Sequence, residues 1–139
     1  MATMPRRDFL KTAAATAAAL AFAPRRLFAE AGASAARVVV AHGTDIPRML
    51  AAGIAALGGW GAFVRPGQKA TLKPNAGWAS TPEQGANTHP QLVEEAIRAI
   101  RVAGASEVVL PENPCSPAAR SFAMSGIGAA AKNAGGRLY

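Results

Sequence analysis

Short runs of β-branched and aliphatic residues alternate with longer stretches of helical spacing, and these runs predict four strands. The strands cover residues 37–42, 69–73, 107–110 and 137–139. The first run reads Arg-Val-Val-Val-Ala-His and is closed by Gly43, a pattern typical of a buried strand. The last run is the beginning of a strand, cut off as it starts.

The stretches between these runs predict three helices. In residues 46–57, apolar side chains recur at intervals of three and four and form one face, and Thr44 or Asp45 can cap this helix. Residues 90–101 separate just as clearly into an apolar face and a charged face. Residues 118–133 form the last helix, in which two glycines near the middle predict a break or a kink.

Alternating strands and helices joined by short turns predict an α/β fold with a parallel sheet. We expect a small parallel sheet of three to four strands covered by helices on its faces, with at least one bare edge. Because the chain stops inside a strand, the sheet is expected to be incomplete. Residues 30–139 are therefore interpreted as a single α/β domain, the N-terminal part of a longer domain or a fragment of one.

Residues 1–29 have the features of an export signal. Residues 5–11 read Pro-Arg-Arg-Asp-Phe-Leu-Lys, which resembles the twin-arginine motif, and the apolar stretch 12–23 is shorter than the ~20 residues that span a bilayer. Small-residue patterns at residues 21–23, 27–29 and 29–31 allow several cleavage positions, and we take the cut after Ala29 as the working boundary. The alternative to a cleaved signal is an amphipathic surface helix or an uncleaved anchor. The twin-arginine translocation machinery is then a partner, membrane contact is limited to export, and the domain is periplasmic or otherwise extracytoplasmic.

The charge of the chain argues against a nucleic-acid partner once this leader is removed. The whole chain has a formal net charge of +7. Residues 30–139 contain ten Lys and Arg against seven Asp and Glu, a balance of +3, with the two signs interspersed. A nucleic-acid interface requires a clustered basic patch, which this pattern does not supply.

A single cysteine, Cys115, limits the redox and metal chemistry that this chain can support by itself. No disulfide can form within the chain, and no zinc or iron–sulfur cage can be built from its cysteines. The sequence therefore has no iron–sulfur motif, and it identifies no cofactor. It also lacks a Gly-x-Gly-x-x-Gly segment after a strand and a Walker-type lysine loop, so nucleotide binding has no specific support.

Polar residues follow three of the predicted strands at their carboxyl ends. They lie in residues 42–45, 73–75 and 112–116, and a long irregular loop, 76–88, continues from the second segment. Ligands of open parallel sheets bind beyond the carboxyl ends of the strands. We therefore expect His42, Lys73, Asn75 and Glu112 to surround a shared hollow.

Four of these loop residues are candidates for ligand binding. They are Lys73, Asn75, Thr88 and His89. Lys73 could neutralise an anionic group, and the start of the helix after Thr88 could add backbone donors. The alternative is structural, with Lys73 as a solvated strand end and His89 as a helix cap.

Metal-binding and catalytic roles have weaker candidates. His42 and Glu112 could ligate a metal, but no histidine pair with close spacing supports this, and His42 could simply end its strand. Cys115 could act as a nucleophile if His42 or His89 lowered its pKa. Glu112 and His89 are the other catalytic candidates, and the alternative for Cys115 is an incidental loop cysteine.

Several segments together resemble the domain of unknown function 362 family. They read Phe-Val-Arg-Pro-Gly-Gln-Lys at residues 63–69, Leu-Lys-Pro-Asn at 72–75 and Thr-His-Pro at 88–90, with Ala-Gly-Ala at 103–105 and Ser-Gly-Ile at 125–127. The resemblance covers the amino-terminal half of the family's domain, from about Val38 onward. It implies the α/β fold and export. It also implies a redox setting, since some members carry cysteine-rich ferredoxin-like segments, although this sequence contains no such segment. Glu112 stands where the family often has an aspartate.

Three functional hypotheses follow from the sequence. The first is an exported α/β protein that binds a small ligand or metal at its strand-end loops in a redox or cofactor-related role. The second is a non-catalytic accessory or binding module whose bare sheet edge is completed by a partner chain. The third is a truncated fragment without independent function, and none of the three assigns a reaction.

Overall fold

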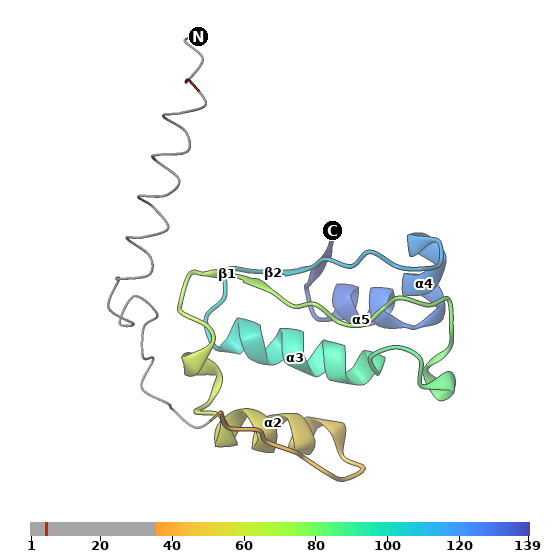
Figure 1. The fold of residues 1–139 in the computed structure, drawn as a ribbon. Helices are drawn as coiled ribbons and strands as arrows, with labels where there is room; N and C mark the ends of the chain where they lie inside the picture. Colours follow the sequence, from red (N-terminus) through yellow and green to blue (C-terminus); the bar gives the residue numbers. More distant parts are fainter. Residues whose placement is uncertain (1–4, 6–35) are drawn as a thin grey trace. The chain divides into compact units, whose positions relative to one another are not determined.

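The computed structural model describes Pro5 and residues 36–139 (Figure 1). The predicted leader and its cleavage site, apart from Pro5, lie outside the described residues. Residues Arg37–Tyr139 form one compact unit. Among the described residues, no helix is both long enough and apolar enough to cross a bilayer.

A three-stranded parallel sheet organises this unit. Its strands are β1 (Lys69–Thr71), β2 (Glu107–Leu110) and β3 (Arg137–Leu138), arranged in the order β1-β2-β3. In the register, Ala70 lies beside Val108, and Leu110 lies beside Leu138. The predicted α/β class and the parallel sheet are therefore confirmed, and Arg137–Leu138 form a paired strand within the predicted segment 137–139.

Each connection between consecutive strands contains helix. α2 (Ile46–Ala56) and a short 3-10 turn, η2 (Trp60–Ala62), precede β1, and α3 (Pro90–Val102) joins β1 to β2. α4 (Ala118–Met124) and α5 (Ile127–Asn133) join β2 to β3, while the loop after β1 contains the 3-10 turn η3 (Pro82–Gln84). The helices predicted near residues 46–57 and 90–101 are confirmed, and Asp45 caps α2 by accepting from the Arg48 N–H at 3.0 Å.

The core lies between the sheet and the helices on one of its sides. The apolar stripe of α3 packs with α5 against alternate residues of β2, Val108 and Leu110, which are fully buried. Ile97 of α3 and Ile127 of α5 are fully buried as well. Within the described residues, α3 and α5 thus cover one face of the sheet rather than both (Figure 1).

The last predicted helix is interrupted near the two glycines at its middle, as the sequence predicted. α4 ends at Met124, and Gly126 takes a left-handed conformation with φ of 74° before α5 begins at Ile127. An L-residue with a side chain rarely adopts this conformation, so glycine is the suitable residue at the break. Gly126 also lies close to the first residue of α3: a Cβ at this position would be 3.4 Å from Pro90.

The predicted first strand at residues 37–42 is wrong. No strand is assigned there, and Val38 and Val40 are 82% and 86% exposed. The segment runs alongside α2 in Figure 1 instead of entering the sheet. A β-branched run favours an extended backbone, but a strand also requires a hydrogen-bonded neighbour, and local sequence does not supply that neighbour.

Candidate functional site

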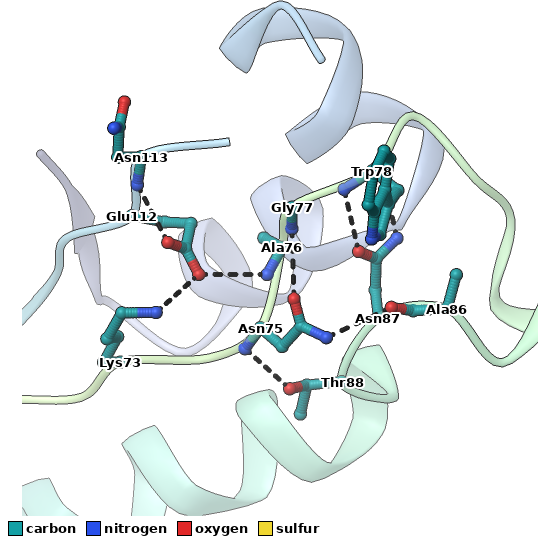
Figure 2. Close-up of polar contacts among 10 residues, drawn as sticks. All are labelled: Lys73, Asn75, Ala76, Gly77, Trp78, Ala86, Asn87, Thr88, Glu112 and Asn113. Atoms are coloured by element: carbon teal, nitrogen blue, oxygen red, sulfur yellow. Dashed lines mark hydrogen bonds and ion pairs between the residues drawn. The ribbon is translucent and has the colours of Figure 1, made fainter. Parts of the chain in front are cut away.

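The carboxyl ends of β1 and β2 bring Lys73 and Glu112 together. The strands are parallel and adjacent, so the residues just beyond them leave the sheet at the same edge. The Nζ of Lys73 donates to Oε2 of Glu112 at 2.8 Å (Figure 2). The sequence separates the two residues by 39 positions, and the sheet topology joins them.

Glu112 is the most enclosed charged group of this cluster, with a side chain that is 9% exposed. Its Oε1 accepts from the N–H of Asn113 at 2.8 Å, and its Oε2 also accepts from the N–H of Ala76 at 3.3 Å. The hydrogen bond from Lys73 lowers the pKa of Glu112, the Asn113 N–H lowers it further, and burial opposes both. Glu112 is therefore an ionised carboxylate that ties both strand ends together.

Asn75 and Thr88 hold the two ends of the long loop in place. The N–H of Asn75 donates to Oγ1 of Thr88 at 2.9 Å, and the N–H of Thr88 donates to the carbonyl of Asn75 at 2.8 Å. The side chain of Asn75 donates to the carbonyl of Ala86 and accepts from the N–H of Gly77 (Figure 2). These polar groups position the loop, so a ligand would meet a preformed surface.

Asn87 braces the same loop, a role that the sequence analysis did not assign. Its Oδ1 accepts from the N–H of Trp78 at 3.1 Å, and its Nδ2 donates to the carbonyl of Trp78 at 2.9 Å. Trp78 is held at a defined position although its side chain is 51% exposed. Only the general preference of asparagine for loops could have pointed to Asn87.

The loop after β2 reaches the long loop through its backbone. The N–H groups of Cys115 and Ser116 donate to the carbonyl of Gly77 at 2.8 and 3.1 Å. The thiol of Cys115 is free and exposed. The predicted convergence of the loops after β1 and β2 is therefore present, with Cys115 at its outer side.

The two histidines lie elsewhere. His89 is the N-cap of α3, and its Nδ1 accepts from the N–H of Gln91 at 3.3 Å, as the structural alternative expected. His42 borders a hollow at the start of α2 with Asp45 and Arg48, and it follows a segment that is not a strand. The structure thus joins Lys73, Asn75 and Glu112 through loop contacts but does not place His42 among their contacts.

Metal coordination gains no geometric support from the described part of the chain. No group of three or more His, Cys, Asp and Glu side chains lies close enough there to hold an ion. His42 and Glu112, the metal candidates, belong to different surroundings. An iron–sulfur cluster does not fit this chain's residues either, because it would need several cysteines and only Cys115 is present.

A groove of about 670 Å³ runs beside β1, between the helices α2 and α3. Its lining is mostly apolar, with Lys73 and Thr88 among the polar members. The walls are formed by Leu50 and Ile54 of α2, by Trp60, Phe63 and Val64 after it, by residues 68–74, and by Leu92, Val93, Ala96 and Ile100 of α3. The groove was not predicted from the sequence, which indicated only the apolar faces of the two helices.

Taken together, fold and site define a small parallel α/β protein with an ordered loop cluster beyond its strand ends and an apolar groove beside its first strand. Residues 71–139 match the model of a protein family described as a domain of unknown function (DUF362). Residues 3–23 match the twin-arginine translocation pathway signal sequence. Both resemblances are thereby confirmed, the family resemblance over residues 71–139 and not from Val38 as expected. The signal sequence implies export through the twin-arginine translocation machinery.

The family match extends from the end of β1 to the last residue of the chain. It includes Lys73, Asn75, Thr88, His89, Glu112 and Cys115, whereas α2 and the segment before it precede the match. No curated protein and no solved structure matches the chain. The family description names no reaction, so the functional argument depends on the geometry.

Proposed function

We propose that this exported domain is a binding module that holds a partly apolar, anionic ligand in the groove beside β1. The observation that supports this most directly is the groove itself, an apolar hollow whose lining also includes Lys73. Its volume falls within the range of about 300–1,000 Å³ that is usual for ligand sites. The module would act in the periplasm or another extracytoplasmic compartment, where the signal sequence directs it.

The chemistry of the lining indicates the class of ligand. Trp60, Phe63 and Leu92 offer apolar surface to the body of a ligand. The ammonium of Lys73 has three donors, and its hydrogen bond to Glu112 uses one of them. An acidic group of the ligand could therefore share this ammonium, while Glu112 keeps Lys73 at a fixed position.

This role favours the binding or accessory hypothesis over an enzyme. The side chains of Asn75 and Thr88 form hydrogen bonds within the loop, and the Nδ1 atom of His89 accepts from a backbone N–H of α3. These groups shape the site next to Lys73 and are proposed to orient the ligand indirectly. The geometry assigns no proton transfer or covalent step to Cys115, Glu112 or His89.

A fluorescent apolar anion, anilinonaphthalene sulfonate, tests this proposal on the purified exported form. We expect one saturable site, with affinity about tenfold weaker in Lys73→Met because a charge-assisted contact is lost. Lys132→Met, in the last turn of α5, is the matched control and should bind as the wild type does. Equal affinity in both variants would overturn the role of Lys73.

A second variant tests the apolar wall. Phe63 lines the groove and is 55% exposed, so Phe63→Ser removes apolar contact with little cost to the core. The variant should bind the dye several-fold more weakly while retaining the thermal unfolding midpoint of the wild type. Dye binding that is unchanged in Phe63→Ser would place the dye outside the groove and reject the proposal.

A further inference from the structure

The strand β1 has one edge without a partner strand in the part of the chain that the structure describes, where it pairs with β2 alone. The N–H of Leu72 donates to the carbonyl of Val109, and the carbonyl of Gln68 accepts from the N–H of Ser106, each at 2.9 Å. Successive peptide groups of a strand point to opposite sides. The backbone groups of Lys69, Thr71 and Lys73 therefore face away from β2, toward the open edge.

The groove runs along this same edge. Seven consecutive residues, 68–74, line it, so it borders the strand along its length and not only one of its faces. Ala70 and Leu72 pack toward the core, on the side where α2 and α3 supply the other apolar walls. A strand added to β1 would thus place every second side chain into the groove.

The side chains on the opposite face of β1 determine which charge the added strand should carry. Lys69 and Lys73 share this face with Thr71, because side chains four residues apart in a strand point the same way. Their side chains are 59% and 65% exposed. Each ammonium has one carboxylate partner, Glu107 at 2.7 Å for Lys69 and Glu112 at 2.8 Å for Lys73, so both retain donors for another acid.

We propose, on the basis of the groove function above, that the occupant is an extended segment of another protein that adds as a strand to β1. This segment alternates apolar residues, which enter the groove, with acidic residues, which meet Lys69 and Lys73. Backbone pairing supplies affinity, and the alternate side chains supply specificity. The proposal names a peptide partner for the groove.

Two other occupants fit the charges less well. Antiparallel pairing of β1 with a second copy, centred on Thr71, would place Lys69 opposite Lys73, and facing like charges destabilise a strand pair. The chain's own extended segment, 37–42, carries Arg37 and His42 and no acid. Charge complementarity therefore favours an acidic segment from a different protein.

A synthetic peptide in which glutamate alternates with valine and leucine tests the inference by isothermal titration calorimetry on the full exported form. We expect binding that weakens with added salt and that is lost when lysine replaces glutamate. Two N-methylated versions, one modified at all glutamates and one at all apolar residues, separate backbone pairing from side-chain binding. One version should bind at least about tenfold more weakly, because only one set of N–H groups faces β1.

The variant Thr71→Pro tests the same edge from the protein side. It removes an N–H that points away from β2, a position where strands tolerate proline. We expect peptide affinity to fall about tenfold or more, and dye affinity to fall by less, because the dye makes no backbone hydrogen bond to β1. Val102→Ala, at the exposed end of α3 and outside the groove lining, is the control and should bind dye and peptide as the wild type does.

The outcomes distinguish this inference from the proposed function. Dye binding without peptide binding, or equal binding of both N-methylated peptides, overturns strand addition and leaves the groove as a ligand site. Loss of both dye and peptide binding in the wild type rejects both proposals. Strong protection of the Thr71 amide from hydrogen exchange in the free protein would show an edge already occupied, which also overturns the inference.

Discussion

Glu112 shows how a single carboxylate can organise a loop cluster. It accepts hydrogen bonds from the Lys73 side chain and from two backbone N–H groups, those of Asn113 and Ala76. The two loops it joins leave different strands, so the contact fixes their separation. Because Lys73 also lines the groove, the same carboxylate sets the position of the ammonium that a ligand would meet.

We predict that Glu112→Gln lowers the free energy of unfolding by about 1 kcal/mol at pH 7, because an amide replaces a charged acceptor. The pKa of Glu112 is lowered below its ordinary value of 4.5, first by the hydrogen bond from Lys73. The ionised group thus stabilises the folded state above about pH 4.5, and this contribution is lost as the pH falls through the lower folded pKa. Urea unfolding measured from pH 7 to pH 3 should therefore show a smaller loss of stability in the variant.

Glu95→Gln is the control for this measurement. Glu95 lies on α3 away from the strand ends, and its replacement should change stability by no more than about 0.5 kcal/mol. Glu107 also has a lowered pKa, caused first by its hydrogen bond with Lys69, so some acid sensitivity should remain in Glu112→Gln. Identical pH profiles for wild type and Glu112→Gln would contradict the stabilising role of this carboxylate.

At the scale of the elements, the break between α4 and α5 is set by Gly126. Replacing it with alanine should cost about 1–2 kcal/mol of stability, because φ of 74° is unfavourable for a residue with a Cβ. The new Cβ would also contact Pro90 at 3.4 Å, at the start of α3. Thermal unfolding followed by circular dichroism measures the effect.

Gly61→Ala is the matched control for the Gly126 variant. Gly61 has no positive φ, and a Cβ there would meet no atom within 4 Å. Its replacement should leave the stability within about 0.5 kcal/mol of the wild type. If Gly126→Ala unfolds at the same temperature as this control, the left-handed break is not required for the fold.

Local sequence signals were enough for most elements of this fold. Residues 107–110 form the predicted strand, and the helix beginning at Pro90 follows its apolar stripe. The strand prediction for residues 37–42 was wrong, because strand formation also depends on a neighbouring strand that is distant in the sequence. With that strand absent, His42 lost its expected place at a strand end.

The candidate site could be predicted only where the sheet topology determines it. Lys73 and Glu112 follow two strands of a parallel sheet, so both were expected at the edge where the strands end, and the observed adjacency of β1 and β2 brings them into contact. The groove was not foreseen, because four elements, α2, η2, β1 and α3, form it, and the apolar residues of α2 and α3 are equally compatible with a core position. The bracing role of Asn87 depends on loop geometry, which has no periodic signal in the sequence.

At the scale of the whole unit, the sheet is covered by α3 and α5 on one side and carries charges on the other. Glu107 bridges Lys69 at 2.7 Å and Arg137 at 2.8 Å, across all three strands. The guanidinium of Arg137 also lies 5.6 Å from the ring centre of Tyr139. Parallel sheets are ordinarily buried on both faces, and this polar network makes the second face compatible with water.

Export should depend on the arginine pair of the leader and not on its overall positive charge. We predict that the double variant Arg6→Lys and Arg7→Lys keeps the charge but abolishes export, since the planar guanidinium fork cannot be replaced by an ammonium. The measurement is the ratio of precursor to processed protein after cell fractionation in a bacterium with a twin-arginine pathway. The pair Arg25→Lys and Arg26→Lys lies outside the matched signal at residues 3–23 and is the control. Processed protein from the Arg6 and Arg7 variant at the wild-type level would contradict twin-arginine export. Selective retention of that variant as precursor would establish this export route.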